Sequence, residues 1–272
     1  MRQLLALCLI ACLALSLAGC GEKMDYYALL TEYSDFNRED AINIDFTYDF
    51  DNPKLAQLDA KWGLSDIAGE GDTQTRALNL LHWLCAHTIK GNPSSLPEGL
   101  EWHAQSLLDW CYDQPESFPN CMQLSIILSE CLLAVGIKAY ALWCFPEVYV
   151  NDNHVVVQVW LPEEERWIML DPSFNLYVMD ETGRILDARE LRGNFAGGIP
   201  MHWNEDTSWN GSGYLDYMAK NSFYFWRKQE MRYGALHKGT RRVYLCPVGY
   251  QLEDKLKDEE PPVYATHESF WR

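Results

Sequence analysis

The chain has 272 residues, of which 48% are hydrophobic and 13% aromatic, a composition typical of a globular protein rather than a disordered one. Its formal net charge of −17 excludes non-specific binding to nucleic acid or to anionic lipid, because those partners are themselves negative. The length suffices for one large domain with a sizeable core.

The N-terminus has the order of an export signal. A short basic start leads into an apolar stretch from Leu4 to Leu17, and small residues precede Cys20, which predicts a secretory signal peptide over residues 1–19. The string Leu17-Ala18-Gly19-Cys20 resembles the bacterial lipobox. That resemblance implies a lipidated Cys20, a short tether over residues 20–25, and a protein anchored to the membrane of the bacterial cell envelope, facing outside the cytoplasm. The alternative is an ordinary signal peptide with a coincidental cysteine.

Three elements are expected before the middle of the chain. Alternating apolar and polar residues from Ile42 to Phe50 predict a half-buried strand. Apolar residues at helical spacing predict a helix from about Thr73 to Lys90, which Gly91-Asn92-Pro93 ends. Residues 92–119 are expected to form a long irregular approach with a short helix near Trp102–Trp110.

Cys121 opens the most strongly predicted helix. Pro119 and Asn120 mark its start, and Gly136 marks its stop after a continuous apolar run. Gln123 stands three residues after Asn120, so a partial capping box is expected. A thiol in the first turn faces unpaired backbone N–H groups and the positive end of the helix dipole, which favour the nucleophilic thiolate. The alternative for this cysteine alone is a packed core residue.

A histidine and an aspartate follow on what the sequence predicts to be neighbouring strands. After a strand from Ile137 to Phe145, a Val-rich run and a Trp-Ile-Met-Leu run flank a Pro/Glu turn with its tip at Leu161–Glu164. With this tip His154 faces Asp171 directly on one side of the hairpin. The same register pairs Trp160 with Glu165, Gln158 with Trp167, and Val156 with Met169.

Cys121, His154 and Asp171 in this order fit a nucleophile, a base and an orienting carboxylate. The alternative is a surface histidine and an aspartate that caps a turn. Because the thiol helix is expected to pack on antiparallel strands that carry the other two residues, the sequence predicts an α+β fold.

Less regular structure is expected in the last third of the chain. Residues 177–186 are predicted as a hairpin turning at Asp180–Gly183, residues 193–213 as a long loop, and Tyr214–Trp226 as a strand or short helix. In the loop, Trp203 and Trp209 either line a substrate groove or pack among other aromatics. Residues 251–261 are predicted as a charged linker, after which Phe270 and Trp271 dock on the domain.

Six cysteines follow the lipobox: Cys85, Cys111, Cys121, Cys131, Cys144 and Cys246. If Cys121 is a free nucleophile, an odd number remains, so at least one further thiol is unpaired. Cys85 and Cys131 fall on apolar helix faces and are expected in the core. His82, Cys85 and His87 do not share one helix face, so no metal site is predicted there.

At the three catalytic candidates the chain resembles the transglutaminase-like superfamily of papain-like cysteine enzymes. The resemblance is carried by Asn120-Cys121, Gly136–Tyr140, Asn153–Val156 and Trp167–Pro172, and it is clear from about Pro119 to Asn175. It implies that Cys121 attacks an amide carbonyl to give a thioester, that His154 moves protons and that Asp171 orients His154, with no cofactor. One position departs from the family pattern, because Pro119 stands where many members carry glycine.

The oxyanion of such a reaction needs hydrogen-bond donors. The backbone N–H of Cys121 is one candidate, and an upstream side chain, Gln114 or Trp110, is the expected second. The alternative for both side chains is a loop or packing role.

Together these patterns predict residues 26–250 as a transglutaminase-like domain with a core at about 74–190, and residues 251–272 as a linker and tail. The expected activity is thioester chemistry on a protein or peptide substrate, with hydrolysis favoured over transfer to an amine because water needs no second site. The other class is a non-catalytic surface protein that binds peptide or glycan.

Overall fold

The computed structural model describes residues 24–93, 96–114, 116–148, 152–209, 211–235, 240–252 and 261–272. The predicted signal peptide, the lipidation site Cys20 and the start of the tether lie outside the described residues, as does most of the predicted linker. Among the described residues, no helix has the length and apolar character needed to cross a membrane.

Helices and strands alternate irregularly along the chain. The helices are α2 (Tyr26–Glu32), α3 (Pro53–Trp62), α4 (Leu64–Ala68), α5 (Thr73–His87), α6 (Ala104–Asp113), α7 (Cys121–Ala134), α8 (Ala188–Gly197), α9 (Gly211–Asn221) and α10 (His267–Phe270). The strands are β1 (Thr47–Tyr48), β2 (Ala139–Phe145), β3 (His154–Leu161), β4 (Arg166–Leu170), β5 (Val178–Met179), β6 (His202–Trp203), β7 (Tyr224–Lys228), β8 (Glu230–Met231), β9 (Arg242–Leu245) and β10 (Val263–Tyr264).

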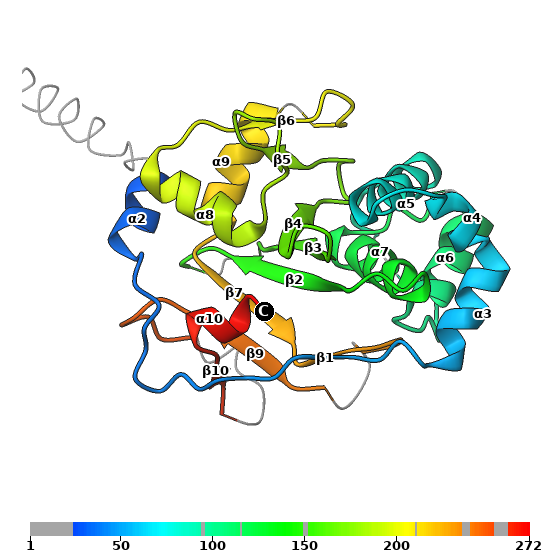
Figure 1. Ribbon diagram of the computed structural model, residues 1–272, viewed down its shortest axis with the longest axis horizontal. Coiled ribbons are helices and arrows are strands. Elements are labelled where there is room, and N and C mark those ends of the chain that lie inside the picture. Colours follow the sequence, from blue (N-terminus) through cyan, green and yellow to red (C-terminus); the bar gives the residue numbers. More distant parts are fainter. Residues whose placement is uncertain are drawn as a thin grey trace, which may run out of the picture.

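A six-stranded sheet in the order β10-β9-β7-β2-β3-β4 forms the centre of the molecule (Figure 1). The strands from β9 to β4 are antiparallel neighbours, as predicted. The edge strand β10 departs from this pattern because it runs parallel to β9. The α+β class predicted from the sequence is therefore confirmed.

The helix that begins at Cys121, α7, contacts both the sheet and the surrounding helices. It packs on β3 and β2, and α3, α5 and α6 pack around it at one end of the sheet (Figure 1). Every residue from Gln123 to Leu133 is buried, which explains why this stretch is largely apolar, and its few polar residues are buried as well. The Ser125 hydroxyl donates to the carbonyl oxygen of Val155 at 2.9 Å and so ties α7 to β3 beside His154.

A buried carboxyl also joins α7 to its surroundings. Glu130 accepts hydrogen bonds from the backbone N–H of Ala104 at 2.8 Å and of Gly234 at 2.9 Å. Burial raises the pKa of Glu130 to about 8, although both N–H groups oppose that rise. The start of α6 and the turn after β8 are thereby held on the Cys121 helix.

The first and last parts of the described chain lie side by side. Ile42 accepts from the N–H of Thr266 and donates to Tyr264, each at 2.9 Å, while Phe270 and Trp271 are buried as predicted. The predicted strand over residues 42–50 is wrong for most of its length, since only β1 pairs, with β8. Its alternating apolar residues make side-chain contacts there instead of a continuous ladder.

Arg227 of β7 contacts both the N-terminal segment around residues 46–48 and the C-terminal segment. Its guanidinium lies over the rings of Tyr140, at 3.3 Å, and Phe46, at 3.8 Å, and it is fully buried. It donates to the Tyr48 hydroxyl at 2.6 Å and to the carbonyl oxygen of Phe270 at 3.1 Å. One cationic side chain therefore fastens both terminal segments to the sheet.

The last third of the chain is more regular than predicted. Residues 193–213, expected as a loop, contain the end of α8, all of β6 and the start of α9. The predicted turn at Asp180–Gly183 is confirmed by the Gly183 N–H donating to the Asp180 carbonyl at 3.0 Å. Trp203 pairs with Val178 in a two-stranded sheet.

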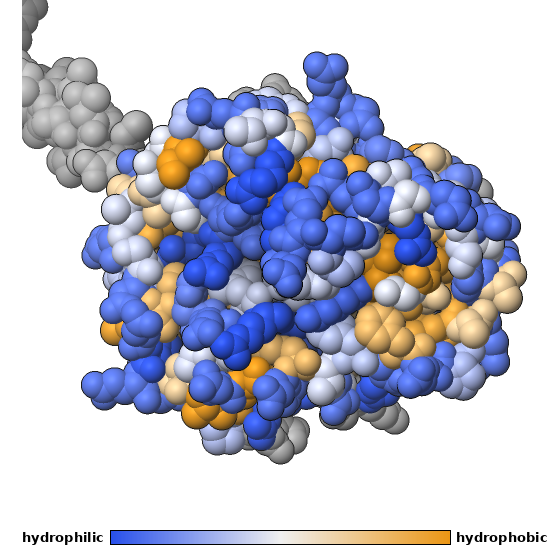
Figure 2. Space-filling model, viewed as in Figure 1, coloured by the Kyte–Doolittle hydropathy of each residue, from blue (hydrophilic) through white to orange (hydrophobic). Residues whose placement is uncertain are grey.

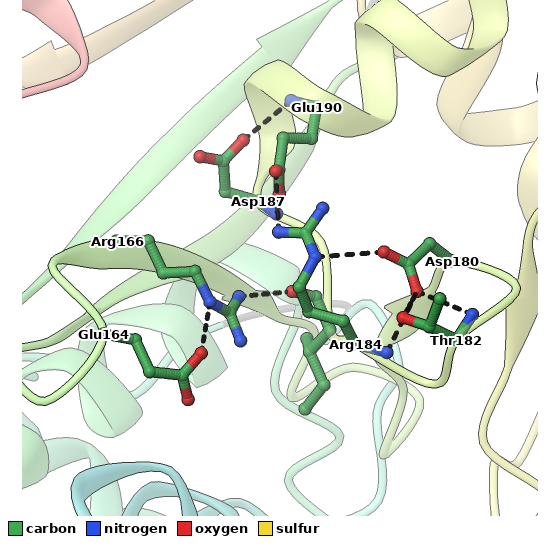
Figure 3. Close-up of polar contacts among 8 residues, drawn as sticks. Glu164, Arg166, Asp180, Thr182, Arg184, Asp187 and Glu190 are labelled. Carbon is green, nitrogen blue, oxygen red and sulfur yellow. Dashed lines mark hydrogen bonds and ion pairs between the residues drawn. The ribbon is translucent and has the colours of Figure 1, made fainter.

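A polar network fixes α8 on the edge of the main sheet (Figure 3). Arg166 of β4 donates to Glu164 at 2.6 Å and to the carbonyl oxygen of Ile185 at 2.7 Å. Arg184 donates to Asp180 at 3.0 Å and to Glu190 of α8 at 2.7 Å. These bonds join the β3–β4 turn, the 180–184 turn and the first turn of α8.

Replacing Arg227 with Met should loosen both terminal segments, because the substitution removes the hydrogen bonds and the stacked charge while keeping an apolar side chain. We expect a loss of about 2–4 kcal/mol in the free energy of unfolding and faster amide hydrogen exchange in residues 42–48 and 264–271. The matched control is Arg166→Met, a partly exposed ion pair that contributes about 0–1 kcal/mol. Unchanged exchange in both segments would contradict this role of Arg227.

Candidate active site

Cys121 is the first residue of α7. The predicted capping box is confirmed: the Asn120 side chain accepts from the Gln123 N–H at 3.1 Å, and the Gln123 side chain accepts from the Asn120 N–H at 2.9 Å. Among the described residues, nothing accepts the backbone N–H groups of Cys121 and Met122. The partly exposed thiol therefore lies beside two unpaired donors at the positive end of a helix.

The approach to Cys121 is fixed by a contact with the segment that follows α5. The Gly91 N–H donates to the Pro119 carbonyl at 2.9 Å. A Cβ at position 91 would lie 2.5 Å from the Cβ of Phe118, so only glycine fits there without displacement. This close approach brings Lys90 and Asn92 to the rim of the site.

The predicted hairpin is present, but its register differs from the prediction. Trp160 pairs with Trp167 and Gln158 with Met169, two positions away from the predicted pairing of Trp160 with Glu165. A shift of two keeps each side chain on its predicted face, because faces alternate with period two. His154 and Asp171 are consequently diagonal neighbours rather than directly opposed, and they still meet.

The imidazole and the carboxylate form a fully buried pair. His154 Nε2 lies 2.6 Å from Asp171 Oδ2, and both side chains have 0% exposure. Asp171 follows the last residue of β4, where it starts a tight turn through its backbone bonds with Leu176. The Ser173 N–H donates to the other carboxylate oxygen at 2.9 Å. The carboxylate therefore holds the His154 imidazole in a single orientation.

The protonation states follow from these neighbours. Burial by itself lowers the pKa of His154, but the Asp171 carboxylate outweighs it and the pKa rises to about 10. Burial also works against the thiolate of Cys121, yet the adjacent His154 outweighs it and the pKa of the thiol is lowered. His154, the N–H of Ser173 and Tyr214 lower the pKa of Asp171 against its own burial. The directions of these shifts favour a thiolate on Cys121 beside a protonated His154.

Aromatic side chains from two segments cover His154. Phe174 stacks on the imidazole with ring centroids 5.9 Å apart, and Tyr217 of α9 meets it edge-on at 5.2 Å. Trp209 packs against Phe174 at 4.4 Å and also contacts Tyr214 and Tyr217. Of the two alternatives for Trp209, aromatic packing is the one observed. This cover excludes water from the ion pair and strengthens it.

A pocket of about 390 Å³ contains Cys121. Its walls come from the segment after α5, from the start of α7, from β2 and β3 and from α9; they include Asn92, Met122, Trp143, Asn153 and Tyr217. Sequence analysis missed these lining residues. The pocket gives the thiol access to a substrate while His154 and Asp171 stay buried behind it.

Gln114 and Trp110, the two upstream residues considered as oxyanion donors, lie outside the Cys121 pocket. The Trp110 indole N–H donates to the Gln114 side chain at 3.3 Å, and neither residue is among those that line the Cys121 pocket. The pocket instead offers the backbone N–H groups of Cys121 and Met122, with the exposed Asn92 side chain on its rim. The sequence alone could not have identified Asn92, because its position depends on the contact between Gly91 and Pro119.

All six domain cysteines are free thiols. Burial raises the pKa of Cys85 to about 12 and raises the pKa values of Cys111, Cys131, Cys144 and Cys246 as well. Only the environment of Cys121 lowers the pKa of the thiol. Cys131 is a core residue as predicted, whereas Cys85 is partly exposed.

Comparison with known proteins gives structural neighbours only. No protein-family model matches the chain, and no curated protein sequence matches it. Among solved structures, a candidate cysteine protease from Cytophaga hutchinsonii aligns with a TM-score of 0.33 and 14% identity over 56% of this chain and 50% of its own. The periplasmic domain of TgpA from Pseudomonas aeruginosa aligns with a TM-score of 0.33 and 19% identity, over 46% and 45% of the two chains.

A third neighbour, LapG from Legionella pneumophila, aligns with a TM-score of 0.33 and 14% identity over 69% of this chain and 85% of its own. The chain thus spans about half the length of the first two neighbours.

Replacing Asp171 with Asn should slow the reaction of Cys121 with iodoacetamide at pH 6. The amide keeps the shape of the carboxylate but loses its charge, so the pKa of His154 falls and the thiol loses its imidazolium partner. A rise of about one unit or more in the pKa of the thiol corresponds to about tenfold slower labelling. Asp180→Asn, in an exposed turn, serves as the control and should label at the parent rate; equal rates for all three proteins would disprove the coupling.

Proposed function

We propose that this chain is a cysteine enzyme that acts on amide bonds of a protein or peptide substrate through Cys121, His154 and Asp171. The observation that supports it most directly is the buried 2.6 Å pair of His154 and Asp171 behind a thiol whose pKa is lowered. A merely structural cysteine at a helix start has no need of an imidazole held in one orientation by a carboxylate.

In the first half of the proposed reaction, the Cys121 thiolate attacks the carbonyl carbon of the amide. A C–S bond forms, and the carbonyl electron pair moves onto oxygen, where the N–H groups at the start of α7 stabilise it. When the intermediate collapses, the C–N bond breaks and the His154 imidazolium gives its proton to the departing amine. Asp171 keeps the ring aligned throughout by accepting from Nε2.

In the second half, the thioester reacts with a nucleophile. His154, now neutral, takes a proton from water as the water oxygen attacks the thioester, and the thiolate of Cys121 leaves to give the carboxylic acid. We favour water over an amine, because hydrolysis requires no second binding site for the acceptor. Protein crosslinking by transfer to an amine uses the same thioester and is the alternative outcome.

We further propose that the enzyme works in the bacterial cell envelope, outside the cytoplasm. The support is the signal-like sequence of residues 1–19 and the lipobox-like string that ends at Cys20. A lipid on Cys20 would hold the domain close to a membrane, since α2 begins at Tyr26.

Alkylation measured against pH tests whether the triad is assembled. The adjacent His154 lowers the pKa of the Cys121 thiol, so Cys121 should label quickly near pH 6 in the parent protein and slowly in His154→Ala. Peptide mass mapping supplies an internal control, because burial raises the pKa values of the other five thiols and Cys85 should stay unlabelled at this pH. Slow labelling of Cys121 that rises only near the pKa of a free thiol would instead favour a non-catalytic binding protein.

Turnover should have a bell-shaped pH profile. Activity rises as the pH passes the lowered pKa of Cys121, because the thiolate forms, and it falls as the pH passes the His154 pKa of about 10, because the leaving amine no longer receives a proton.

Released amines from a casein digest measure hydrolysis, and incorporation of a fluorescent primary amine into a Gln-containing protein measures transfer. Cys121→Ala should abolish both signals, whereas Cys111→Ala, at a buried thiol outside the pocket, should keep them; activity that survives in Cys121→Ala would refute the mechanism.

A further inference from the structure

A second cavity, of about 330 Å³, lies between α8, α10 and the segment that follows α2. Its lining contains no acidic side chain, although the chain carries 39 acidic residues against 22 basic ones. Figure 2 shows a largely hydrophilic surface between α8 and α10. The side chains that matter for its chemistry are Ser34, Phe36, Arg189, Arg192, His267 and Trp271.

Arg192 contributes a buried and uncompensated positive charge. The residue is 6% exposed, and its guanidinium donates only to backbone carbonyl oxygens, those of Ser222 at 2.9 Å and Tyr33 at 2.6 Å. Among the described residues, no carboxylate lies within 4.0 Å of it. Burial accordingly lowers the pKa of Arg192 to about 10. A buried guanidinium without a carboxylate partner is a favourable partner for an anion.

Arg189 adds a second charge one helical turn before Arg192. It is exposed, and no carboxylate of the described residues forms an ion pair with it. The two acidic residues near it at the start of α8 have other hydrogen-bond partners. Asp187 caps the helix by accepting from the Glu190 N–H at 2.7 Å, and the Glu190 side chain accepts from Arg184 (Figure 3). Arg189 and Arg192 both line the cavity, and the charge of Arg189 is only partly offset by the nearby Asp187.

His267 and Trp271 supply further donors from the opposite wall. Phe36 contacts both groups: its ring centroid lies 5.6 Å from that of His267 and 4.5 Å from the Arg192 guanidinium. Burial, and then the charges of Arg189 and Arg192, lower the pKa of His267, and all three residues line the same cavity. Trp271 is 7% exposed and its indole N–H has no hydrogen-bond partner among the described residues.

We propose that this cavity, hereafter the α8–α10 pocket, binds a phosphate group through Arg189, Arg192, His267 and the indole N–H of Trp271. Donors that converge from two helices suit a tetrahedral anion with several oxygens better than a flat carboxylate. An anion there would offset the charges of Arg189 and Arg192 and would accept from the unpaired indole N–H of Trp271. The proposal is independent of the chemistry at Cys121.

The phosphate could belong to a lipid headgroup or to a soluble compound. Ser34 lines the pocket and follows α2, which packs on α8 near the N-terminal end of the described chain (Figure 1). A membrane-tethered domain would thus keep the pocket near lipid headgroups. A free phosphate monoester offers the same oxygens without the diester.

Equilibrium dialysis of the full chain in neutral detergent, with radiolabelled inorganic phosphate at constant ionic strength, tests the proposal. We expect saturable binding of one phosphate per chain, weakened about tenfold in Arg189→Gln because one charge-assisted contact is lost. Trp271→Phe, which keeps most of the ring and removes the N–H, should weaken binding about threefold to tenfold. Arg189 is exposed, so its variant should fold, and unchanged alkylation of Cys121 would confirm that it does.

Competition then separates the two sources. Displacement of the label by short-chain phosphatidylglycerol below its micelle concentration supports a lipid headgroup, and displacement by glycerol 3-phosphate alone supports a soluble monoester. Arg166→Gln, which removes an equal charge from the β3–β4 turn, should bind phosphate like the parent protein. Absence of saturable binding below about 10 mM, or equal weakening in Arg189→Gln and Arg166→Gln, would overturn the proposal.

Discussion

Removing an imidazole and a carboxylate from water costs several kcal/mol for each ion unless close partners replace the solvent. At the centre of this molecule the replacement comes from the pair itself, from the Ser173 N–H and from the neighbouring Tyr214. Each partner requires a different part of the fold: the β3–β4 register, the tight turn after β4, and α9 laid across both. The position of these elements is therefore constrained by a single buried interaction.

The six free thiols differ in pKa, and hence in reactivity, because their surroundings differ. Four are buried and Cys85 is partly exposed. In all five, burial raises the pKa of the thiol, even in Cys246 where the nearby Arg38 opposes the rise, so these cysteines act as small apolar residues. Cys121 is held against a protonated imidazole at the start of a helix, where the thiolate is favoured. Nothing in the amino-acid type separates them. The difference lies in the capping residues Asn120 and Gln123 and in His154, which begins a strand 33 residues after Cys121.

The sequence predicted the elements that carry this chemistry because they are specified locally. Asn120 and Gln123 define the start of α7, and period-two alternation places His154 and Asp171 on one face even though the predicted pairing was two residues off. Other predictions failed where distant contacts decide. The alternation in residues 42–50 includes Phe46 and Tyr48, which contact Arg227. Asn92 was not considered as an oxyanion donor, because nothing in the sequence reports the contact of Gly91 with Pro119.

The pairing of residue 42 with residues 264–266 affects the order in which the chain can fold. Closing so large a loop has a high entropic cost, and contacts of long sequence separation form slowly. A chain that leaves the ribosome, or crosses a membrane, with its N-terminal end first cannot complete this contact until its last residues arrive. Until then Phe46 and Tyr48 lack the Phe270 side of their packing, and β9 exposes the edge that β10 covers. Folding of the sheet therefore ends with the C-terminal segment, and the open β9 edge is the surface most prone to mispairing during synthesis.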